Sequence, residues 1–268
     1  MTDWRSHFGF HTAPFTRELT VAQRFPLPMF DEVLTALFRA VDQRGSAALV
    51  APAGTGKTAL LRALVDQLPE ARYRVHYVKV TSIGKRDLCR EMAAACGLAP
   101  TGTYSGLVRR LQERFETCHS SEGLRPVLLL DEAHDLRPDV LGMLRILTNF
   151  DMDSRLVLSM VLAGQPSLLT ILKRDELEAV SRRMGHLATL RLLSRGESRQ
   201  YMEHRVRIAG SRQFPFDDQA TEAVFELTRG NLRAIDHLCR KSLEIAALNG
   251  HPAVDATTVT AARARLLP

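Results

Sequence analysis

The segment Ala51-Pro-Ala-Gly-Thr-Gly-Lys-Thr58 follows an apolar run at residues 47–50 and precedes a helical pattern that starts at Ala59. Its glycines allow the backbone to wrap so that N–H groups and the N-terminus of the next helix face phosphate oxygens. Lys57 is placed to reach the β- and γ-phosphates, and Thr58 is placed to ligate Mg²⁺. A strand, a glycine-rich loop and a helix in this order predict binding of ATP or GTP.

The loop departs from the usual phosphate-binding pattern, G-x-x-x-x-G-K-[ST], at its first position, where Ala51 replaces glycine. So short a motif also arises by chance, and its position between a strand and a helix is what makes it specific. The residues expected to contact the nucleotide are Pro52, Ala53, Gly54, Thr55, Gly56, Lys57, Thr58 and Ala59.

A second apolar run, at residues 127–130, ends in the carboxylates Asp131 and Glu132, which is a Walker B pattern. A central parallel strand is buried on both faces, and ligands bind at its carboxyl end. We expect Asp131 to join Thr58 in holding Mg²⁺, and Glu132 to orient and deprotonate the attacking water. Alone, such a pair is often the solvated end of a strand. Together with the loop, it predicts an enzyme that hydrolyses ATP or GTP with Mg²⁺.

The composition is typical of a soluble globular protein, with 45% hydrophobic and 25% charged residues in a chain of 268. The first ten residues contain no apolar signal segment, and no run approaches the roughly 18 apolar residues of a membrane span. We therefore expect a cytoplasmic protein with no membrane partner.

The four cysteines, Cys89, Cys96, Cys118 and Cys239, show no C-x-x-C spacing. Three of them lie in apolar helical patterns, which favours buried free thiols over a zinc site. The sequence implies no metal other than Mg²⁺.

The net charge of +6 makes the chain attractive to polyanions, although a modest excess is also common in proteins that never meet nucleic acid. Across residues 180–241, Arg and Lys outnumber Asp and Glu by twelve to seven. The C-terminal third is therefore locally basic.

Strand and helix patterns alternate along the first two thirds of the chain. The expected strands are residues 47–50, 75–80, 127–130, 156–163 and about 188–192; the expected helices follow the loop and cover residues 85–96, 105–116 and 138–149. This alternation predicts an α/β fold in which a parallel five-stranded sheet lies between two helical layers.

From about Ser194 onward the pattern is entirely helical. Ser194 and Glu197 form a capping box, and Asp217 and Asp255 are placed to cap two later helices. We expect an N-terminal segment packed on the ATPase core (residues 1–45), a nucleotide-binding domain (46–193) and a helical lid (194–268).

Four motifs together resemble those of AAA+ ATPases over nearly the whole chain: residues 51–58, Leu130-Asp-Glu-Ala-His134, Leu162-Ala-Gly-Gln-Pro166 and Gly230-Asn-Leu-Arg-Ala-Ile-Asp236. Within these ATPases the sequence is most similar to a branch that contains the ExeA-type secretion ATPases and the TnsC, TniB and IstB regulators of DNA transposition. The opening Phe8-Gly-Phe10 and Pro14-Phe15 is also similar to this branch. The motifs are specific for the branch and much less so for the member.

The resemblance implies roles for further residues, each with an alternative. Gln165 becomes the sensor 1 residue that hydrogen-bonds the γ-phosphate or the lytic water, unless it is a simple turn residue. Arg233 becomes the sensor 2 arginine of the lid, unless it has only a surface role. Arg182 or Arg183 becomes the arginine finger that stabilises the transition state in a neighbouring subunit, and the sequence leaves open which one acts.

The segment 24–32 lies where such proteins cradle the adenine. Ordinary packing of Phe25 and Phe30 into the core explains the same pattern equally well. Both interpretations stay open at the level of sequence.

Proteins of this branch assemble into rings or filaments when they bind ATP, and hydrolysis takes the assemblies apart. The transposition regulators hold duplex DNA and present it to a transposase. By resemblance, DNA contacts are expected from loops after the second strand and from nearby helices, although each residue can equally belong to a solvated face. The candidates are Lys79, Thr81, Lys85 and Arg86, with Arg109 and Arg110 as weaker ones.

Two other functions compete with transposition. A secretion ATPase is expected to carry a transmembrane span and a wall-binding region after the ATPase, and this sequence ends at Pro268. That end, together with the basic lid, favours the DNA function. A nucleotide-dependent signalling module without a DNA partner is the third possibility.

Overall fold

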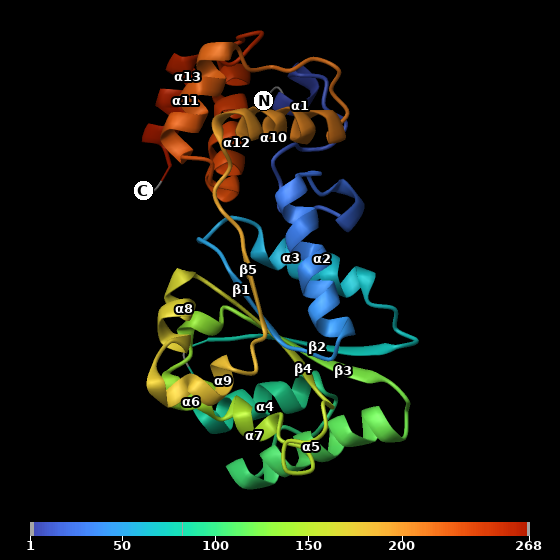
Figure 1. The fold of residues 1–268 in the computed structure, drawn as a ribbon. Coiled ribbons are helices and arrows are strands. Elements are labelled where there is room, and N and C mark those ends of the chain that lie inside the picture. The colour runs from blue at the N-terminus through green and yellow to red at the C-terminus, as the bar shows by residue number, and fades with distance from the viewer. Residues whose placement is uncertain (1–2, 82, 267–268) are drawn as a thin grey trace. The chain divides into compact units, whose positions relative to one another are not determined.

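A computed structural model describes residues 3–81 and 83–266 of the chain (Figure 1). The chain forms two compact units. The sheet unit contains Pro28–Pro52 and Lys57–Leu190, and the helical unit contains Met1–Leu27, Ala53–Gly56 and Arg191–Pro268.

The sheet unit is built on a five-stranded sheet with the order β2-β3-β4-β1-β5, in which all pairs are parallel. The strands are β1 (Ala47–Val50), β2 (Tyr73–Lys79), β3 (Arg125–Asp131), β4 (Ser159–Gly164) and β5 (His186–Thr189). All five strands run in one direction, so the carboxyl ends of β1, β3 and β4 share one edge of the sheet, the edge at which ligands bind in such folds.

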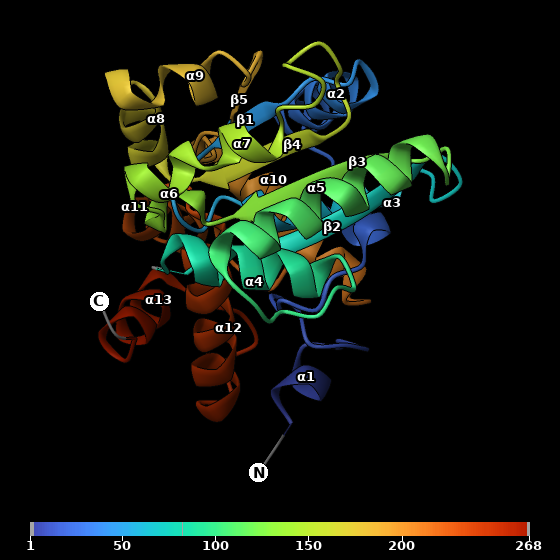
Figure 2. The same ribbon diagram turned by 90° about the horizontal axis from the view of Figure 1, so that it is seen from below.

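Helices cover both faces of this sheet, which confirms the predicted α/β sandwich (Figures 1 and 2). One face carries α2 (Pro28–Asp42) and α3 (Lys57–Gln67). The other carries α4 (Lys85–Ala95), α5 (Tyr104–Ser120), α6 (Pro138–Gly142), α7 (Leu144–Leu147), α8 (Pro166–Leu172) and α9 (Glu178–Ser181), with short 3-10 turns η2 (Ala133–Asp135) and η3 (Asp175–Leu177) between them.

The strand β3 illustrates why this sequence forms a central strand. From Pro126 to Asp131 every residue is buried. Side chains alternate along a strand, and Leu128 and Leu130 belong to the same core cluster as Leu88 and Leu111 of α4 and α5. Each fully buried leucine contributes about 1.5–3 kcal/mol to folding. A strand that is apolar on both faces therefore gains most in the middle of the sheet.

Several expected elements differ in extent from the observed ones, and the largest differences concern one helix and two strands. The helix expected at 138–149 is divided into α6 and α7 at Met143. The fourth strand begins at Ser159, where its pairing with Val127 of β3 begins, and the chain before it contains an isolated antiparallel bridge between Phe150 and Arg155. The last strand is shifted to His186–Thr189 because its register follows the four residues of β1.

The helical unit contains α1 (Trp4–His7), η1 (Val21–Gln23), α10 (Arg195–Ile208), α11 (Asp218–Thr228), α12 (Leu232–Leu248) and α13 (Ala256–Ala264). The predicted caps are confirmed. Ser194 accepts a hydrogen bond from the backbone N–H of Glu197, whose side chain accepts one from the backbone N–H of Ser194. The Asp217 and Asp255 side chains cap α11 and α13 by accepting hydrogen bonds from the backbone N–H groups of Ala220 and Thr258.

The N-terminal segment that we expected as one piece, residues 1–45, is divided between the units, because α2 belongs to the sheet unit and the residues before it to the helical unit. Polar contacts explain the second assignment. The Arg205 guanidinium donates to the carbonyl oxygen of Thr16, and His204 Nε2 lies 2.9 Å from that of Gln23. The other two boundaries, 46–193 and 194–268, stay a proposal.

All four cysteines are buried and free, as predicted from the apolar patterns around them. Burial raises the pKa of Cys89 to about 11 and that of Cys96 to about 12, so both thiols stay protonated at neutral pH. None of the helices in the described part of the chain is both long and apolar enough to cross a membrane.

Candidate active site

The loop after β1 has the backbone geometry that its glycines predict. Gly54 and Gly56 have φ angles of +76° and +95°, in the region that only glycine adopts at low cost. Lys57 begins α3 and is buried, and its Nζ donates to the carbonyl oxygens of Ala51 at 3.1 Å and Pro52 at 3.2 Å. The ammonium group is therefore held against the backbone of the loop.

Thr58 and Asp131 come from α3 and from the end of β3, and the fold brings them into contact. Thr58 Oγ1 donates to Asp131 Oδ2 at 2.7 Å, and the backbone N–H of Glu132 donates to Asp131 Oδ1 at 2.9 Å. Asp131 is only 1% exposed. A hydroxyl and a carboxylate are the hard oxygen ligands that Mg²⁺ prefers, so this pair fits the predicted metal.

The sequence interpretation missed Tyr77 on β2. Its hydroxyl donates to Asp131 Oδ2 at 3.1 Å, the same oxygen that Thr58 contacts. Burial, together with the negative charge of Asp131, raises the pKa of Tyr77 to about 12, so the hydroxyl remains a donor. The alternation of side chains along β2 is the signal that could have placed Tyr77 on the α3 face of the sheet.

Glu132 follows Asp131 with a φ of 59°, an uncommon conformation for a residue other than glycine that is often found at functional sites. Its Oε2 atom is buried and has no hydrogen-bond partner among the residues that the structure describes. His134 Nδ1 lies 3.5 Å from this oxygen, and Gln165 Nε2 lies 2.7 Å from His134 Nε2. Glu132 and Gln165, predicted from separate motifs, thus lie on either side of one imidazole.

The lid motif contacts the loop residues that belong to the helical unit. Asn231 caps α12 and donates from Nδ2 to the carbonyl oxygen of Ala53 at 2.7 Å. The backbone N–H of Arg233 donates to the carbonyl oxygen of Gly54 at 3.2 Å. A Cβ on Gly54 would lie 2.4 Å from Asn231 Oδ1, so the close approach also requires glycine. Asn231 was missed, although an asparagine after Gly230 at a helix start was a visible capping signal.

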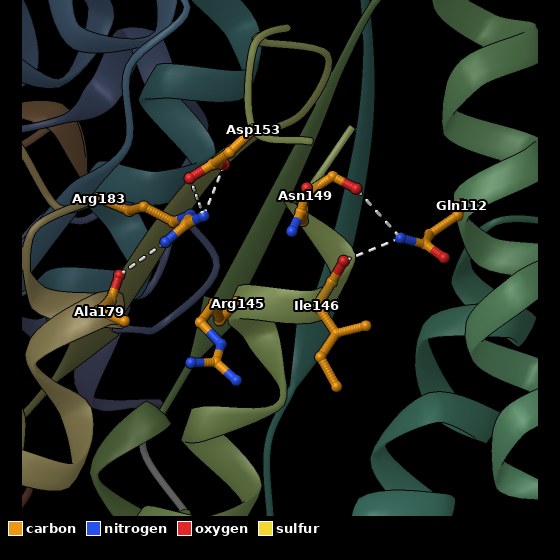
Figure 3. A pocket seen from close by; sticks show the side chains of 7 residues that line it. All are labelled: Gln112, Arg145, Ile146, Asn149, Asp153, Ala179 and Arg183. Carbon is orange, nitrogen blue, oxygen red and sulfur yellow. Dashed lines mark hydrogen bonds and ion pairs between the residues drawn. The ribbon is translucent and has the colours of Figure 1, made fainter. Parts of the chain in front are cut away.

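Arg182 and Arg183 have different environments. The Arg182 side chain is 78% exposed and contacts Glu178 one helical turn back. The Arg183 guanidinium lies 2.6 Å from both carboxylate oxygens of Asp153 and 2.9 Å from the carbonyl oxygen of Ala179 (Figure 3). It lines a pocket of about 540 Å³ together with Gln112, Arg145, Ile146, Asn149, Asp153 and Ala179. Arg183 is therefore anchored within its own unit, whereas Arg182 points outward.

The residues expected to contact DNA differ in their exposure and in their polar partners. Lys79 and Thr81 are exposed at the end of β2. Lys85 Nζ lies 3.6 Å from Asp139, and Arg86 donates to the carbonyl oxygen of Gly102 at 3.1 Å.

The weaker candidates have partners on their own surface. Arg109 pairs with Glu113 at 3.7 Å, and Arg110 donates to the carbonyl oxygen of Thr101.

Many of the arginines that make the C-terminal third basic are ion-paired. Arg191 contacts Glu197 at 2.7 Å, and Arg199 contacts Asp218 at 2.7 Å. These ion pairs neutralise part of the positive charge, so the surface of the C-terminal third is less basic than its composition indicates.

In the segment 24–32, Phe25 is 8% exposed and Phe30 is 5% exposed. The Phe25 ring packs against Tyr201 and His204. Core packing thus accounts for both phenylalanines, and contact of this segment with adenine stays a prediction.

Comparison with known proteins agrees with this geometry. Residues 39–172 match the model of the family described as AAA domain. The chain is 31% identical over 248 residues to General secretion pathway protein A of Aeromonas hydrophila. The aligned region covers 91% of this chain and 45% of the relative. The chain thus spans less than half the length of this relative. The name of the relative refers to secretion, one of the two functions found in the branch that the motifs resemble.

Solved structures share the fold. The Aeropyrum pernix ORC1 protein in complex with DNA has a TM-score of 0.72 at 21% identity, covering 96% of this chain and 69% of that one. Cdc6p from Pyrobaculum aerophilum has a TM-score of 0.72 at 19% identity, covering 94% and 70%. The Thermotoga maritima RuvB Holliday junction branch migration motor has 0.61 at 16%, covering 92% and 74%. With residues 39–172 matching its model, the chain belongs to the AAA domain family, and its fold is that of an AAA+ P-loop NTPase.

Proposed function

We propose that this chain is a Mg²⁺-dependent ATPase that hydrolyses ATP to ADP and phosphate. The contact between Thr58 and the buried Asp131, with Glu132 as the next residue, is the observation that carries the proposal. Bound Mg²⁺ would supply positive charge at the β- and γ-phosphate oxygens. The chain itself must bind the phosphates, orient the water and remove its proton.

Lys57 leaves the carbonyl oxygens of Ala51 and Pro52 for the phosphates, and Thr58 and Asp131 are the residues that would hold Mg²⁺. The water oxygen forms a bond to the γ-phosphorus as the bond to the bridging oxygen of ADP breaks, and Glu132 takes the proton of the water. The buried Oε2 atom of Glu132, which has no hydrogen-bond partner in the described part of the chain, is available for this role.

Three further residues complete the proposed site. Gln165 acts as sensor 1, next to the end of β3, and Arg233 acts as sensor 2 from the first turn of α12. Of the two finger candidates we propose Arg182, because its guanidinium is exposed while that of Arg183 is bound to Asp153. A finger acts across a subunit boundary, so this proposal includes self-association into rings or filaments when ATP binds.

We further propose that the assembled protein binds duplex DNA and acts as a regulator of DNA transposition that recruits or activates a transposase. The motif resemblance and the exposed Lys79 and Thr81 at the end of β2 support this role. A weak basic patch on each protomer is multiplied when ordered subunits present it along the phosphate backbone. Binding of this kind tolerates changes in DNA sequence, because phosphate contacts carry no sequence information.

A second candidate is an ATPase associated with secretion. The 31% identity to General secretion pathway protein A favours it. The two candidates share the ATPase chemistry and differ in whether the assembled protein binds duplex DNA.

Fluorescence anisotropy with labelled duplexes, at two salt concentrations and with or without a non-hydrolysable ATP analogue, tests the DNA role. We expect binding that needs the analogue, falls steeply with salt and is weakened by Lys79→Glu. Lys173→Glu makes the same charge change at an exposed position of the sheet unit and should leave DNA binding unchanged. Assembly with ATP but without DNA affinity would replace the transposition role by the secretion candidate.

Mixing of variants tests the finger. Arg182→Ala should bind ATP and lose hydrolysis, and activity should return when it is combined with a Lys57→Ala protein, because each subunit then supplies what the other lacks. Arg183→Ala should keep hydrolysis. Recovery with Arg183→Ala instead of Arg182→Ala would reverse the assignment, and no recovery at any mixing ratio would contradict a trans finger.

A further inference from the structure

His134 occupies a position that the proposed mechanism leaves without a role. It lies on η2, directly after β3, and its side chain is 11% exposed. One ring nitrogen faces Gln165 at the end of β4, and the other faces Glu132. Gly164 permits this approach, since a Cβ at that position would lie 3.2 Å from the backbone nitrogen of His134.

The orientation of the Gln165 amide determines which ring nitrogen carries the proton. Gln165 Nε2 is a donor, so His134 Nε2 at 2.7 Å accepts and the neutral ring carries its proton on Nδ1. Asp135 Oδ1 lies 3.6 Å from Nε2, beyond hydrogen-bond distance. The N–H on Nδ1 is therefore directed at the side on which Glu132 lies.

The His134 ring and the Glu132 carboxylate lie close together without a hydrogen bond between them. Nδ1 and Oε2 are 3.5 Å apart, and both atoms are buried without a hydrogen-bond partner in residues 3–81 and 83–266. Buried polar atoms in native proteins are nearly always paired. A donor and an acceptor that face each other across a distance slightly beyond bonding range can pair after a small rotation of the ring. Catalytic hydrogen bonds often shorten in this manner once substrate is bound.

We propose that His134 is a positioning residue that couples Gln165 to Glu132. When the γ-phosphate draws the Gln165 amide toward its oxygens, the hydrogen bond to His134 Nε2 breaks and the ring is released. His134 Nδ1 then donates to Glu132 Oε2 and holds the carboxylate in the orientation that leaves Oε1 toward the water. Glu132 is thus oriented only when a γ-phosphate is present. This inference rests on the proposed ATPase function.

Three substitutions at position 134 separate coupling from packing. Asn places its amide where Nδ1 of histidine lies, so His134→Asn keeps a donor for Glu132; Gln places its amide where Nε2 lies, so His134→Gln keeps only the side facing Gln165. We expect kcat to fall by about 10–100-fold in His134→Ala and His134→Gln, as for other positioning partners, and to fall by less than about 5-fold in His134→Asn. The dissociation constant of a fluorescent ATP analogue should stay within about 2-fold in all three.

The experiment measures kcat, analogue binding and thermal unfolding midpoints for these variants, and adds a double-mutant cycle with Gln165→Ala. Coupling predicts that the double variant His134→Ala with Gln165→Ala loses clearly less activity than the product of the single losses. Equal losses in the Asn and Gln variants, an additive cycle, or unchanged kcat in His134→Ala would overturn the inference. Wild-type protein without ATPase activity, or Glu132→Gln with full activity, would instead contradict the proposed function itself.

Discussion

The sheet unit and the helical unit each contain a polar cluster around a carboxylate that is largely shielded from solvent, and the two clusters are built differently. The sheet-edge cluster consists of Thr58, Asp131, Glu132, His134 and Gln165. The helical cluster consists of Tyr201 and Arg205 of α10 and Asp236 of α12.

In the helical cluster the Asp236 carboxylate faces the positively charged guanidinium of Arg205. Arg205, which is 3% exposed, lies 3.5 Å from Asp236 and donates to Tyr201 Oη at 3.1 Å, while Tyr201 donates to Asp236 at 2.8 Å. In the sheet-edge cluster Asp131 accepts hydrogen bonds from two hydroxyls, and none of the described residues forms a hydrogen bond with Glu132 Oε2. Burial of polar groups therefore does not by itself mark a functional site. Buried acids whose protein partners are hydroxyls, or that lack a partner, mark the place where a ligand completes the electrostatics.

The largest effect that we expect is a loss of ATP hydrolysis on substitution in the sheet-edge cluster. Glu132→Gln should lower kcat by about 10²–10⁴-fold, because the amide cannot accept the proton of the water, while ATP affinity stays near that of wild type. Lys57→Ala should instead lose ATP binding. Single-turnover hydrolysis and equilibrium binding of a fluorescent ATP analogue measure the two quantities. An equal loss of affinity in both variants would remove Glu132 from the role of general base.

The second effect is a loss of stability that we expect from substitution in the helical cluster. Arg205→Met leaves Asp236 buried without its ion-pair partner and should lower the free energy of unfolding by about 3–5 kcal/mol. Arg240→Met removes an ion pair with Glu244 whose arginine is 56% exposed, and should change stability by less than about 1 kcal/mol. Urea unfolding of the two variants checks the contrast, and equal losses would show that the helical cluster has no special structural role.

The same cluster should give stability a pH dependence of known sign. Burial raises the pKa of Asp236 from 3.8 to about 6, against the opposing effect of Arg205. Between these values the folded state binds more protons than the unfolded state, so this contribution to stability is present below about pH 4 and is lost as pH rises through about 6. Its size is about 1–3 kcal/mol. Urea unfolding at pH 4 to 7 should show a flatter profile in Asp236→Asn, and an unchanged profile would contradict the assignment.

The smallest effect tests Tyr77 against a matched tyrosine of the same strand. Tyr77→Phe removes a donor to Asp131 and should raise the Mg²⁺ concentration for half-maximal activity by about 3–10-fold, because partners of metal ligands fix their orientation. Tyr73→Phe removes a hydroxyl that donates to Asp42 and should leave the Mg²⁺ dependence unchanged. A similar shift in both variants would assign the effect to the strand instead of the hydroxyl.

Local patterns in the sequence were sufficient for the fold class and for the principal site residues. The glycines of the loop, the apolar run before Asp131 and the caps at Ser194, Asp217 and Asp255 act through their immediate neighbours. Backbone conformation and strand burial depend on residues within a few positions, so a sequence read in short windows contains them. The end of the Walker B strand and the loop after β1 could therefore be assigned to one site before their contact was known.

Only the tertiary structure decided which side chains meet. The contacts of Tyr77 with Asp131 and of His134 with Gln165 join residues more than thirty positions apart on different elements. It also decided that Arg183 is bound to Asp153 while its neighbour Arg182 is exposed. Composition and periodicity state which side chains a segment offers, but the partner of a charged or polar side chain is chosen by packing between segments far apart in the chain, and that choice has no local signature in the sequence.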